Sequence, residues 1–321
     1  MQKHDARKAI HIWVIHDDKP GHLSQLQGLT QRLIAHAETT IRWIDSKEVN
    51  TTIKSMFGKT PMEHGEERPD MVLGAGHGTH RPLLKLAKQY SAISVVMMKP
   101  SFPLRMFDFV ICPKHDELEE NDRTLNTYGA INKIEPSKTE KINKEKHLVL
   151  LGGPSKHYEW DDDILLKEIG IVCNTFSKKA WHLSSSPRTP DTFLNKVADL
   201  NIQNLELHDY HQDAALNLIS SLEQCSQAWI TPDSVSMLYE SLTSGCQTSI
   251  FSLAPNNRIR PSKVVKQVQE LVQNKNIGNI NMLAAGHMDE LLPSTFWEAE
   301  RAALWLLKKY THLRVSRDAS I

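Results

Sequence analysis

The sequence predicts an α/β protein built from two doubly wound parallel sheets. Short apolar runs of strand character alternate with segments of helical periodicity along almost the whole chain. This alternation is typical of parallel strands covered by helices on both faces. The runs form two series separated by a polar stretch at residues 132–146, and a length of 321 residues also favours two domains.

Ten apolar runs are predicted as strands, five in each half of the chain. The first five are residues 9–15, 39–44, 71–75, 93–98 and 107–113. The second five are residues 147–153, 180–186, 205–210, 227–231 and 247–253. Apolar residues at helical spacing predict helices over residues 22–36, 79–90, 235–244 and 294–313.

These elements predict the domain organisation. We expect one domain over residues 1–135 and a second over residues 146–290. Residues 132–146, rich in Lys, Glu, Asn and Ser, are predicted to be the linker. Residues 291–321 are expected to hold a C-terminal helix that packs back on the domains.

The composition is that of an ordinary globular protein and disfavours several classes. Hydrophobic residues make up 40% of the chain, charged residues 24%, and the formal net charge is zero. A zero net charge argues against a nucleic-acid partner held by a strongly basic surface. The four cysteines are dispersed without a C-x-x-C pair, which predicts free thiols in a reducing compartment. With no signal peptide and no long apolar run, we expect a cytoplasmic protein.

Polar residues and glycines collect where the predicted strands end. Ligands of open α/β sheets bind outside the carboxyl ends of the strands, so these loops are the candidate sites. The loops of the first half are residues 16–22, 74–80 and 113–116, and those of the second half are residues 152–155, 184–190 and 230–240. We expect both sets to face one cleft.

The stretch ITPDSVSMLYE at residues 230–240 has the pattern of a strand, a turn and a helix start. Asp233 or Ser234 is suited to cap the helix, because its side-chain oxygen can accept from first-turn amides. Such a turn also suits a phosphate group, since free amides and the helix dipole favour negative charge. Ser236 and Glu240 share one helix face, where Glu240 could accept from ribose hydroxyls. An ordinary capped turn is the alternative.

Three further patterns each have a simpler explanation. Gly74, Gly76 and Gly78 resemble a dinucleotide fingerprint, but the third glycine comes one position early and no acidic residue ends the next strand. They favour close backbone approach or a positive φ instead. His77 and His80 lack a zinc spacing, so no metal site is predicted. Arg188 suits a phosphate, with an exposed loop arginine as the alternative.

Six dispersed motifs together resemble those of the mitochondrial-fission protein family, which was named from a plant member and has many bacterial homologues. They are KPGHLSQLQGL (19–29), PDMVLGAG (69–76), FDFVICPKHD (107–116), LLGGPS (150–155), SSSPRTP (184–190) and ITPDSVSMLYE (230–240). The resemblance implies a GT-B-like architecture, in which two Rossmann-like domains face each other across a cleft. Two departures stand out: Pro187 replaces a usual second basic residue, and Asp18 replaces a usual glycine.

A looser resemblance is to the glycosyltransferase that adds N-acetylglucosamine to the lipid-linked peptidoglycan precursor. It implies that Gly21 and His22 lie on the acceptor and catalytic side, and that Gly152, Gly153, Ser155, Ser234, Ser236 and Glu240 lie on the donor side. The polar residues of the strand-end loops extend both sets. The donor-binding residues would be Gly152, Gly153, Ser155, Arg188, Thr189, Ser234, Ser236 and Glu240. The acceptor side would hold Gly21, Gly76, His77, His115 and Asp116. The catalytic base would be His22, Asp17 or Asp18, which can titrate within reach of neutral pH.

The expected function is therefore transfer of a sugar from a nucleotide-sugar donor to a hydroxyl acceptor, such as a lipid-linked or cell-surface glycan. We expect no cofactor and no metal, because fixed donors can stabilise the leaving group. Two alternatives stay open: a sugar-nucleotide epimerase, and a non-catalytic scaffold associated with a membrane. Basic residues near the C-terminus (Lys308, Lys309, Arg314 and Arg317) could attract the inner face of a membrane, and the alternative is that they cap a helix end.

Overall fold

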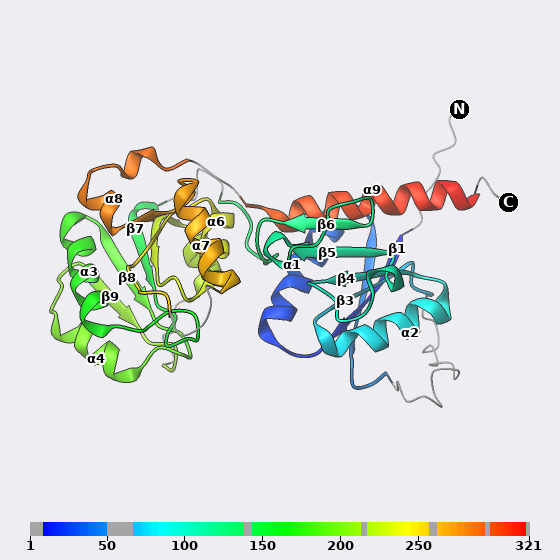
Figure 1. Cartoon of the computed structure of the whole chain (residues 1–321), viewed down its shortest axis with the longest axis horizontal. Helices are drawn as coiled ribbons and strands as arrows, with labels where there is room; N and C mark the ends of the chain where they lie inside the picture. Colours follow the sequence, from blue (N-terminus) through cyan, green and yellow to red (C-terminus); the bar gives the residue numbers. More distant parts are fainter. Residues whose placement is uncertain are drawn as a thin grey trace. The chain divides into compact units, whose positions relative to one another are not determined.

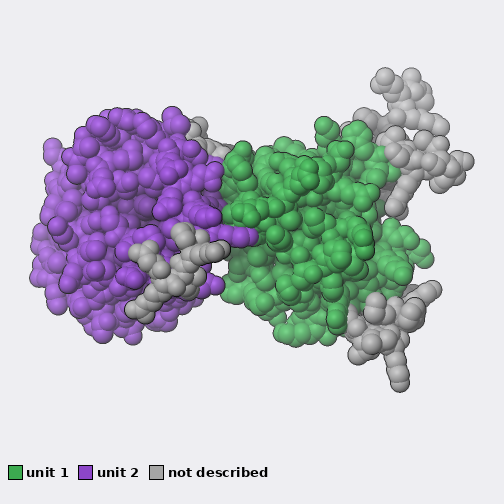
Figure 2. Space-filling view, in the orientation of Figure 1, with its two compact units in different colours: residues 1–133, 297–321 green, residues 134–296 purple. Residues whose placement is uncertain are grey.

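The computed structural model describes residues 9–49, 67–137, 143–212, 217–256, 262–292 and 296–318. The chain divides into two compact units, coloured separately in Figure 2. Unit 1 consists of Met1–Lys133 and Trp297–Ile321, and unit 2 of Ile134–Phe296. Each unit contains one six-stranded sheet whose strands pair in parallel, so the predicted α/β class is confirmed.

The sheet of unit 1 reverses its direction of growth between β1 and β3. In sheet order its strands are β2 (Thr39–Asp45), β1 (Ile10–His16), β3 (Met71–Ala75), β4 (Ile93–Met97), β5 (Phe109–Pro113) and β6 (Thr124–Thr127). The chain moves from β1 outward to β2, then returns to the other side of β1 and continues from β3 to β6. The neighbours β1 and β3 therefore form the topological switch point of this sheet.

Helices cover both faces of this sheet, as Figure 1 shows. They are α1 (Pro20–His36), α2 (His80–Tyr90) and α9 (Glu298–Asp318), with short 3-10 turns η2 (His77–Thr79), η3 (Leu104–Met106) and η4 (Lys114–Asp116). Val14 packs with α1 and α9, whereas its neighbours Trp13 and Ile15 pack with α2. This alternation follows from the period of two along a strand.

Charged contacts join α9 to α1. The Glu300 carboxylate accepts from Arg32 Nε at 2.7 Å and pairs with His36 Nε2 at 2.7 Å. Burial of Glu300 raises its carboxyl pKa, but the hydrogen bonds from Arg32 and His36 outweigh this, and the net pKa is lowered. The last described helix is thus part of the core of unit 1.

The sheet of unit 2 repeats the same arrangement. In sheet order its strands are β12 (Gly278–Asn279), β11 (Gln247–Ile250), β10 (Cys225–Ile230), β7 (Asn143–Leu150), β8 (Ala180–Ser184) and β9 (Leu205–His208). The chain moves from β7 through β8 to β9, then returns to the other side of β7 and continues from β10 to β12. Here β7 and β10 form the switch point.

Helices again lie on both faces (Figure 1). They are α3 (Asp162–Thr175), α4 (Asp191–Asp199), α5 (Leu218–Leu222), α6 (Val235–Ser244), α7 (Lys263–Gln273) and α8 (Ile280–Ala284), with a 3-10 turn η6 (Met288–Glu290). Trp181 and Trp229 are buried against α3 and α4, whereas Leu150 and Ile230 are buried with α6 and α7. Parallel strands buried on both faces explain the continuous apolar runs of the sequence.

The ten predicted strands are all present, but the prediction missed two strands and misjudged the linker. The missed strands are β6 and β12, a polar edge strand and a strand of two residues. Within the predicted linker at residues 132–146, Ile134 is buried in unit 2 and β7 begins at Asn143, so these described residues belong to the fold of unit 2. Strand β5 begins at Phe109, since the preceding Asp108 carboxylate accepts from the Ser94 amide at 2.8 Å.

All four cysteines (Cys112, Cys173, Cys225 and Cys246) are free. The sulfurs of Cys225 and Cys246 lie 2.9 Å apart in the core of unit 2. Among the helices of the described residues, none combines the length and the apolar character needed to cross a bilayer.

Candidate functional site

In unit 2, the loop after β7 is bonded to the loop after β10 at the switch point. The Gly152 amide donates to Thr231 Oγ1 at 2.7 Å, and the Gly153 amide donates to Asp233 Oδ2 at 3.0 Å. A Cβ on Gly152 would collide with the Asp233 carboxylate, and a Cβ on Gly153 would collide with the Arg188 carbonyl group. Only glycines permit these close approaches. Ligands of open α/β sheets bind at this position in the fold.

The Arg188 guanidinium also contacts both loops. Its Nη1 lies 2.7 Å from Asp233 Oδ2 and donates to the Gly153 carbonyl oxygen at 3.1 Å. The Asp233 side chain is 1% exposed and that of Arg188 is 44% exposed. The charge of Arg188 is therefore already compensated by a buried carboxylate, although part of its guanidinium faces solvent.

Buried hydroxyl groups hold the Gly152 carbonyl group. Ser186 Oγ donates to that oxygen at 2.7 Å, and Thr189 Oγ1 donates to it at 2.6 Å. Ser155 has a similar local role, since its Oγ accepts from the amides of His157 and Tyr158 at 3.1 and 3.2 Å. The geometry thus places Ser155 and Thr189, both predicted as donor-binding residues, in the framework of the loops.

The helix α6 begins directly after this cluster, and its capping differs from the expectation. Ser234 occupies the N-cap position without a side-chain capping bond, and Asp233 contacts Gly153 and Arg188 instead. The predicted capping role of these two side chains is therefore wrong. Ser236 is exposed and Glu240 is half-buried on the same helix. First-turn amides without a side-chain cap favour an anion.

A residue that the sequence analysis missed, His157, belongs to this site. Burial lowers the pKa of His157, and the charges of Lys156 and Arg188 lower it further. Its Nδ1 is buried and has no hydrogen-bond partner among the described residues. Burial and the Asp233 charge raise the pKa of the adjacent Tyr158. The sequence signal that could have identified His157 is its position in the loop after Gly152–Gly153.

In unit 1, Asp17 and His22 form a hydrogen-bonded pair after β1. His22 Nδ1 lies 2.8 Å from Asp17 Oδ1, and Lys19 Nζ lies 3.1 Å from Asp17 Oδ2. Burial alone would raise the pKa of Asp17, but the bonds from His22 and Lys19 outweigh it and lower the pKa. Because Asp17 contacts Nδ1, the second ring nitrogen of His22 is the one left to contact a ligand.

Glycines of the loop after β3 pack against this pair. Gly76 has φ +82°, and a Cβ there would collide with the His22 imidazole. A Cβ on Gly78 would lie 3.5 Å from that of Asp17. The predicted use of these glycines for close approach and positive φ is therefore confirmed at Gly76. The pair lies at the β1–β3 switch point.

The remaining candidate site residues of unit 1 lie outside the Asp17–His22 pair. Asp18 has φ 58° and lies 2.8 Å from His16 Nδ1 and 3.5 Å from Lys47 Nζ. Gly21 lies in the first turn of α1 with open space around it, and His77 is exposed in η2. His115 and Asp116 lie in η4 after β5, where the Asp116 carbonyl oxygen accepts from Lys99 at 3.0 Å.

Two solved structures share this fold, and the name of one states that it acts on a nucleotide sugar. The UDP-GlcNAc 2-epimerase of Methanocaldococcus jannaschii matches with a TM-score of 0.54 and 13% identity, covering 93% of this chain and all of that one. MurG of Acinetobacter baumannii matches with a TM-score of 0.50 and 10% identity, covering 91% of this chain and 95% of that one. These likenesses define a GT-B-like fold.

The model of the mitochondrial fission ELM1 family matches residues 20–310, and the chain belongs to that family. An uncharacterised protein of Rickettsia prowazekii (strain Madrid E) is 22% identical over 320 aligned positions. That alignment covers 81% of this chain and 88% of the relative. The predicted family membership is confirmed.

Proposed function

We propose that the protein is a glycosyltransferase that moves a sugar from a nucleotide-sugar donor to a hydroxyl acceptor. The observation that carries the proposal is the placement of a polar cluster at the switch point of each sheet. The cluster of unit 2 combines close-packed glycines with an uncapped helix start, and that of unit 1 contains a histidine oriented by a half-buried aspartate. The fold shared with nucleotide-sugar enzymes supports it.

Unit 2 would bind the nucleotide sugar. The first-turn amides of α6, with the hydroxyl groups of Ser234 and Ser236, would hold the diphosphate. The exposed part of Arg188 would donate to phosphate oxygens while Asp233 keeps it in place. Glu240, one turn along the helix, would accept from the ribose hydroxyl groups.

Unit 1 would supply the general base. His22 would remove the proton of the acceptor hydroxyl group as its oxygen bonds to the sugar and the bond to the diphosphate breaks. Asp17 would fix the tautomer of His22 and stabilise the imidazolium. Asp18 is less suited to this role, because it is exposed and paired with His16 and Lys47. The loops that contain Gly21, Gly76, His77, His115 and Asp116 would contact the acceptor, a lipid-linked or surface glycan.

An epimerase is the second candidate. It is favoured by the similarity to a UDP-GlcNAc 2-epimerase over the whole length of that enzyme. The two activities differ in their products, since an epimerase converts the nucleotide sugar without an acceptor and a transferase releases a nucleoside diphosphate. Chromatography of UDP-GlcNAc incubated with the protein, with and without an acceptor mixture, separates them.

The first test is a thermal-shift screen of the purified chain with UDP, GDP, CMP, ADP and NAD. A ligand at about 100 times its Kd adds roughly 2.7 kcal/mol of stability. We expect one nucleoside diphosphate to stabilise the protein, E240A to lose the effect, and E270A on the exposed face of α7 to retain it. No shift with any nucleotide would contradict the proposal and leave a non-catalytic, membrane-associated scaffold as the better explanation.

A further inference from the structure

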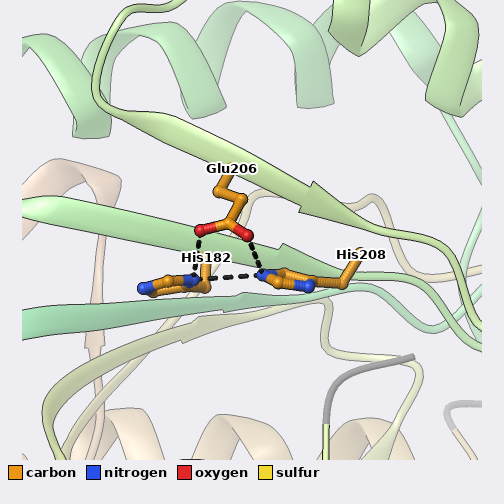
Figure 3. Close-up of side chains that lie close together, drawn as sticks. All are labelled: His182, Glu206 and His208. Atoms are coloured by element: carbon orange, nitrogen blue, oxygen red, sulfur yellow. Dashed lines mark hydrogen bonds and ion pairs between the residues drawn. The ribbon is translucent and has the colours of Figure 1, made fainter. Parts of the chain in front are cut away.

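Two histidines and a glutamate converge on the edge of the unit 2 sheet, away from the loops described above. His182 lies on β8 and pairs in register with Glu206 on the edge strand β9. His208 lies two residues beyond Glu206, so all three side chains are on one face of the sheet. Figure 3 shows both imidazole rings and the carboxylate directed toward one another.

The possible donor atoms of these three side chains lie close enough together to share one metal ion. His182 Nδ1 lies 3.0 Å from His208 Nε2 and 3.3 Å from a Glu206 oxygen, and His208 Nε2 lies 3.6 Å from the other oxygen. Ligands about 2.0–2.1 Å from a tetrahedral zinc ion are separated by about 3.3 Å. Within the described part of the chain, these three residues form a group whose side chains could hold a metal ion.

We propose that His182, Glu206 and His208 bind a zinc ion through His182 Nδ1, the Glu206 carboxylate and His208 Nε2. Two imidazoles and one carboxylate are a ligand set that zinc takes in proteins, with the fourth position open to water or substrate. The side chain of Glu206 is 65% exposed, whereas those of His182 and His208 are 19% and 13% exposed. The open position would therefore lie on the solvent side.

The site would also stabilise one of the loops of the nucleotide site. The Ser185 amide donates to the His208 carbonyl oxygen at 3.1 Å, and Ser185 Oγ donates to Asp209 at 3.2 Å. A metal ion joining β8 to β9 would hold the point from which the loop to Arg188 starts. No ligand of the ion takes part in the proposed nucleotide contacts, so the two proposals can fail separately.

This metal site cannot be predicted from the spacing of its residues in the sequence. His182 and Glu206 are separated by 23 intervening residues. Neither this spacing nor that between Glu206 and His208 matches a zinc motif. They become neighbours only because β8 pairs with β9 in one particular register. The expectation of no metal rested on the histidines of the N-terminal half.

The test uses the full chain, freed of metal with a chelator and titrated with Zn²⁺ in competition with a chromophoric chelator. We expect one tight equivalent per chain, and an intense visible spectrum from four-coordinate Co²⁺ in its place. E206Q and H208N should each weaken Zn²⁺ binding at least tenfold. H287A removes one member of an exposed His–Glu pair at 3.4 Å in the same unit and should leave binding unchanged.

Two results would overturn the proposal. One is the absence of a tight equivalent in the wild-type chain. The other is unchanged affinity in both E206Q and H208N, which would show that others of the 16 histidines bind the metal adventitiously. Circular dichroism of each variant establishes that it is folded, and Glu206 is exposed enough for E206Q to leave the core intact. UDP binding to the wild-type chain, measured in parallel, tests the proposed function, and the Zn²⁺ titration tests the metal site.

Discussion

The Arg188 guanidinium lies 2.7 Å from the buried carboxylate of Asp233, and this ion pair joins the loops that follow β8 and β10. These two strands lie on either side of β7, and the Gly153 loop that follows β7 contacts both members of the pair. One interaction therefore orders three strand-end loops. Its loss should lower both the stability of unit 2 and the affinity for the proposed nucleotide.

Removal of Arg188 alone should be more harmful than removal of both charges. R188A leaves the Asp233 carboxylate buried without its cation, and we expect a loss of about 1–3 kcal/mol in the free energy of unfolding. R188A/D233N should recover part of that loss, because the uncompensated charge is gone. Urea unfolding of the wild type, both single variants and the double variant measures the coupling. Strict additivity would show that the pair contributes no interaction energy.

A methyl group at Gly153 should disrupt the same loops. G153A would place its Cβ against the Arg188 carbonyl group, so we expect a lower Tm and weaker nucleotide binding. G170A is the matched control, since Gly170 lies in α3 with nothing near its Cβ and alanine favours a helix by about 1 kcal/mol. Equal melting temperatures for G153A and the wild type would contradict the close approach.

Replacement of His22 should separate catalysis from nucleotide binding. H22Q removes the proposed base, and we expect release of nucleoside diphosphate to fall roughly 10²–10⁴-fold. D17N keeps the imidazole and an oxygen that can accept from it, but loses the negative charge that would stabilise the imidazolium, so a smaller loss is expected. The nucleotide Kd of both variants, measured by calorimetry, should match that of the wild type. Undiminished turnover in H22Q would exclude this residue as the base.

The Asp17 carboxylate should make the stability of unit 1 depend on pH in the acid range. Its folded-state pKa is lowered from 3.8, so the stabilisation is fully present above that value and is lost as pH falls through the folded pKa. D17N should lack this contribution and lose less stability between pH 5 and acid conditions. Urea midpoints at a series of pH values check it, and parallel curves for the two proteins would contradict it.

The sequence allowed prediction of those features that depend on local pattern. Buried parallel strands produce continuous apolar runs, and for this reason ten of the twelve strands in the described residues were predicted. β6 and β12 were missed because a polar edge strand and a two-residue strand lack that signal. The switch-point loops were also predictable, since glycines and polar residues directly follow the central strands.

Contacts between residues on different strands could not be predicted from the sequence. The pairing of Arg188 with Asp233, and that of His182 with His208, depends on which strands are neighbours and in which register. The side chain of Asp233 shows the difficulty, because helix capping and a long-range ion pair compete for the same oxygens. Local propensity favours the cap, whereas the tertiary structure supplies a cation and an amide that the sequence does not reveal.

The position of α9 has a consequence for biosynthesis. Unit 2 is one continuous stretch, but unit 1 receives its last helix from residues that follow unit 2 in the chain. As the chain leaves the ribosome, unit 2 can therefore fold before unit 1 is complete. Until α9 arrives, the apolar side chains of α1 and of its sheet lack the α9 residues that pack against them in the folded protein, among them Ala302, Ala303 and Leu306. Unit 1 is thus the part of the nascent chain that needs protection from aggregation for longest.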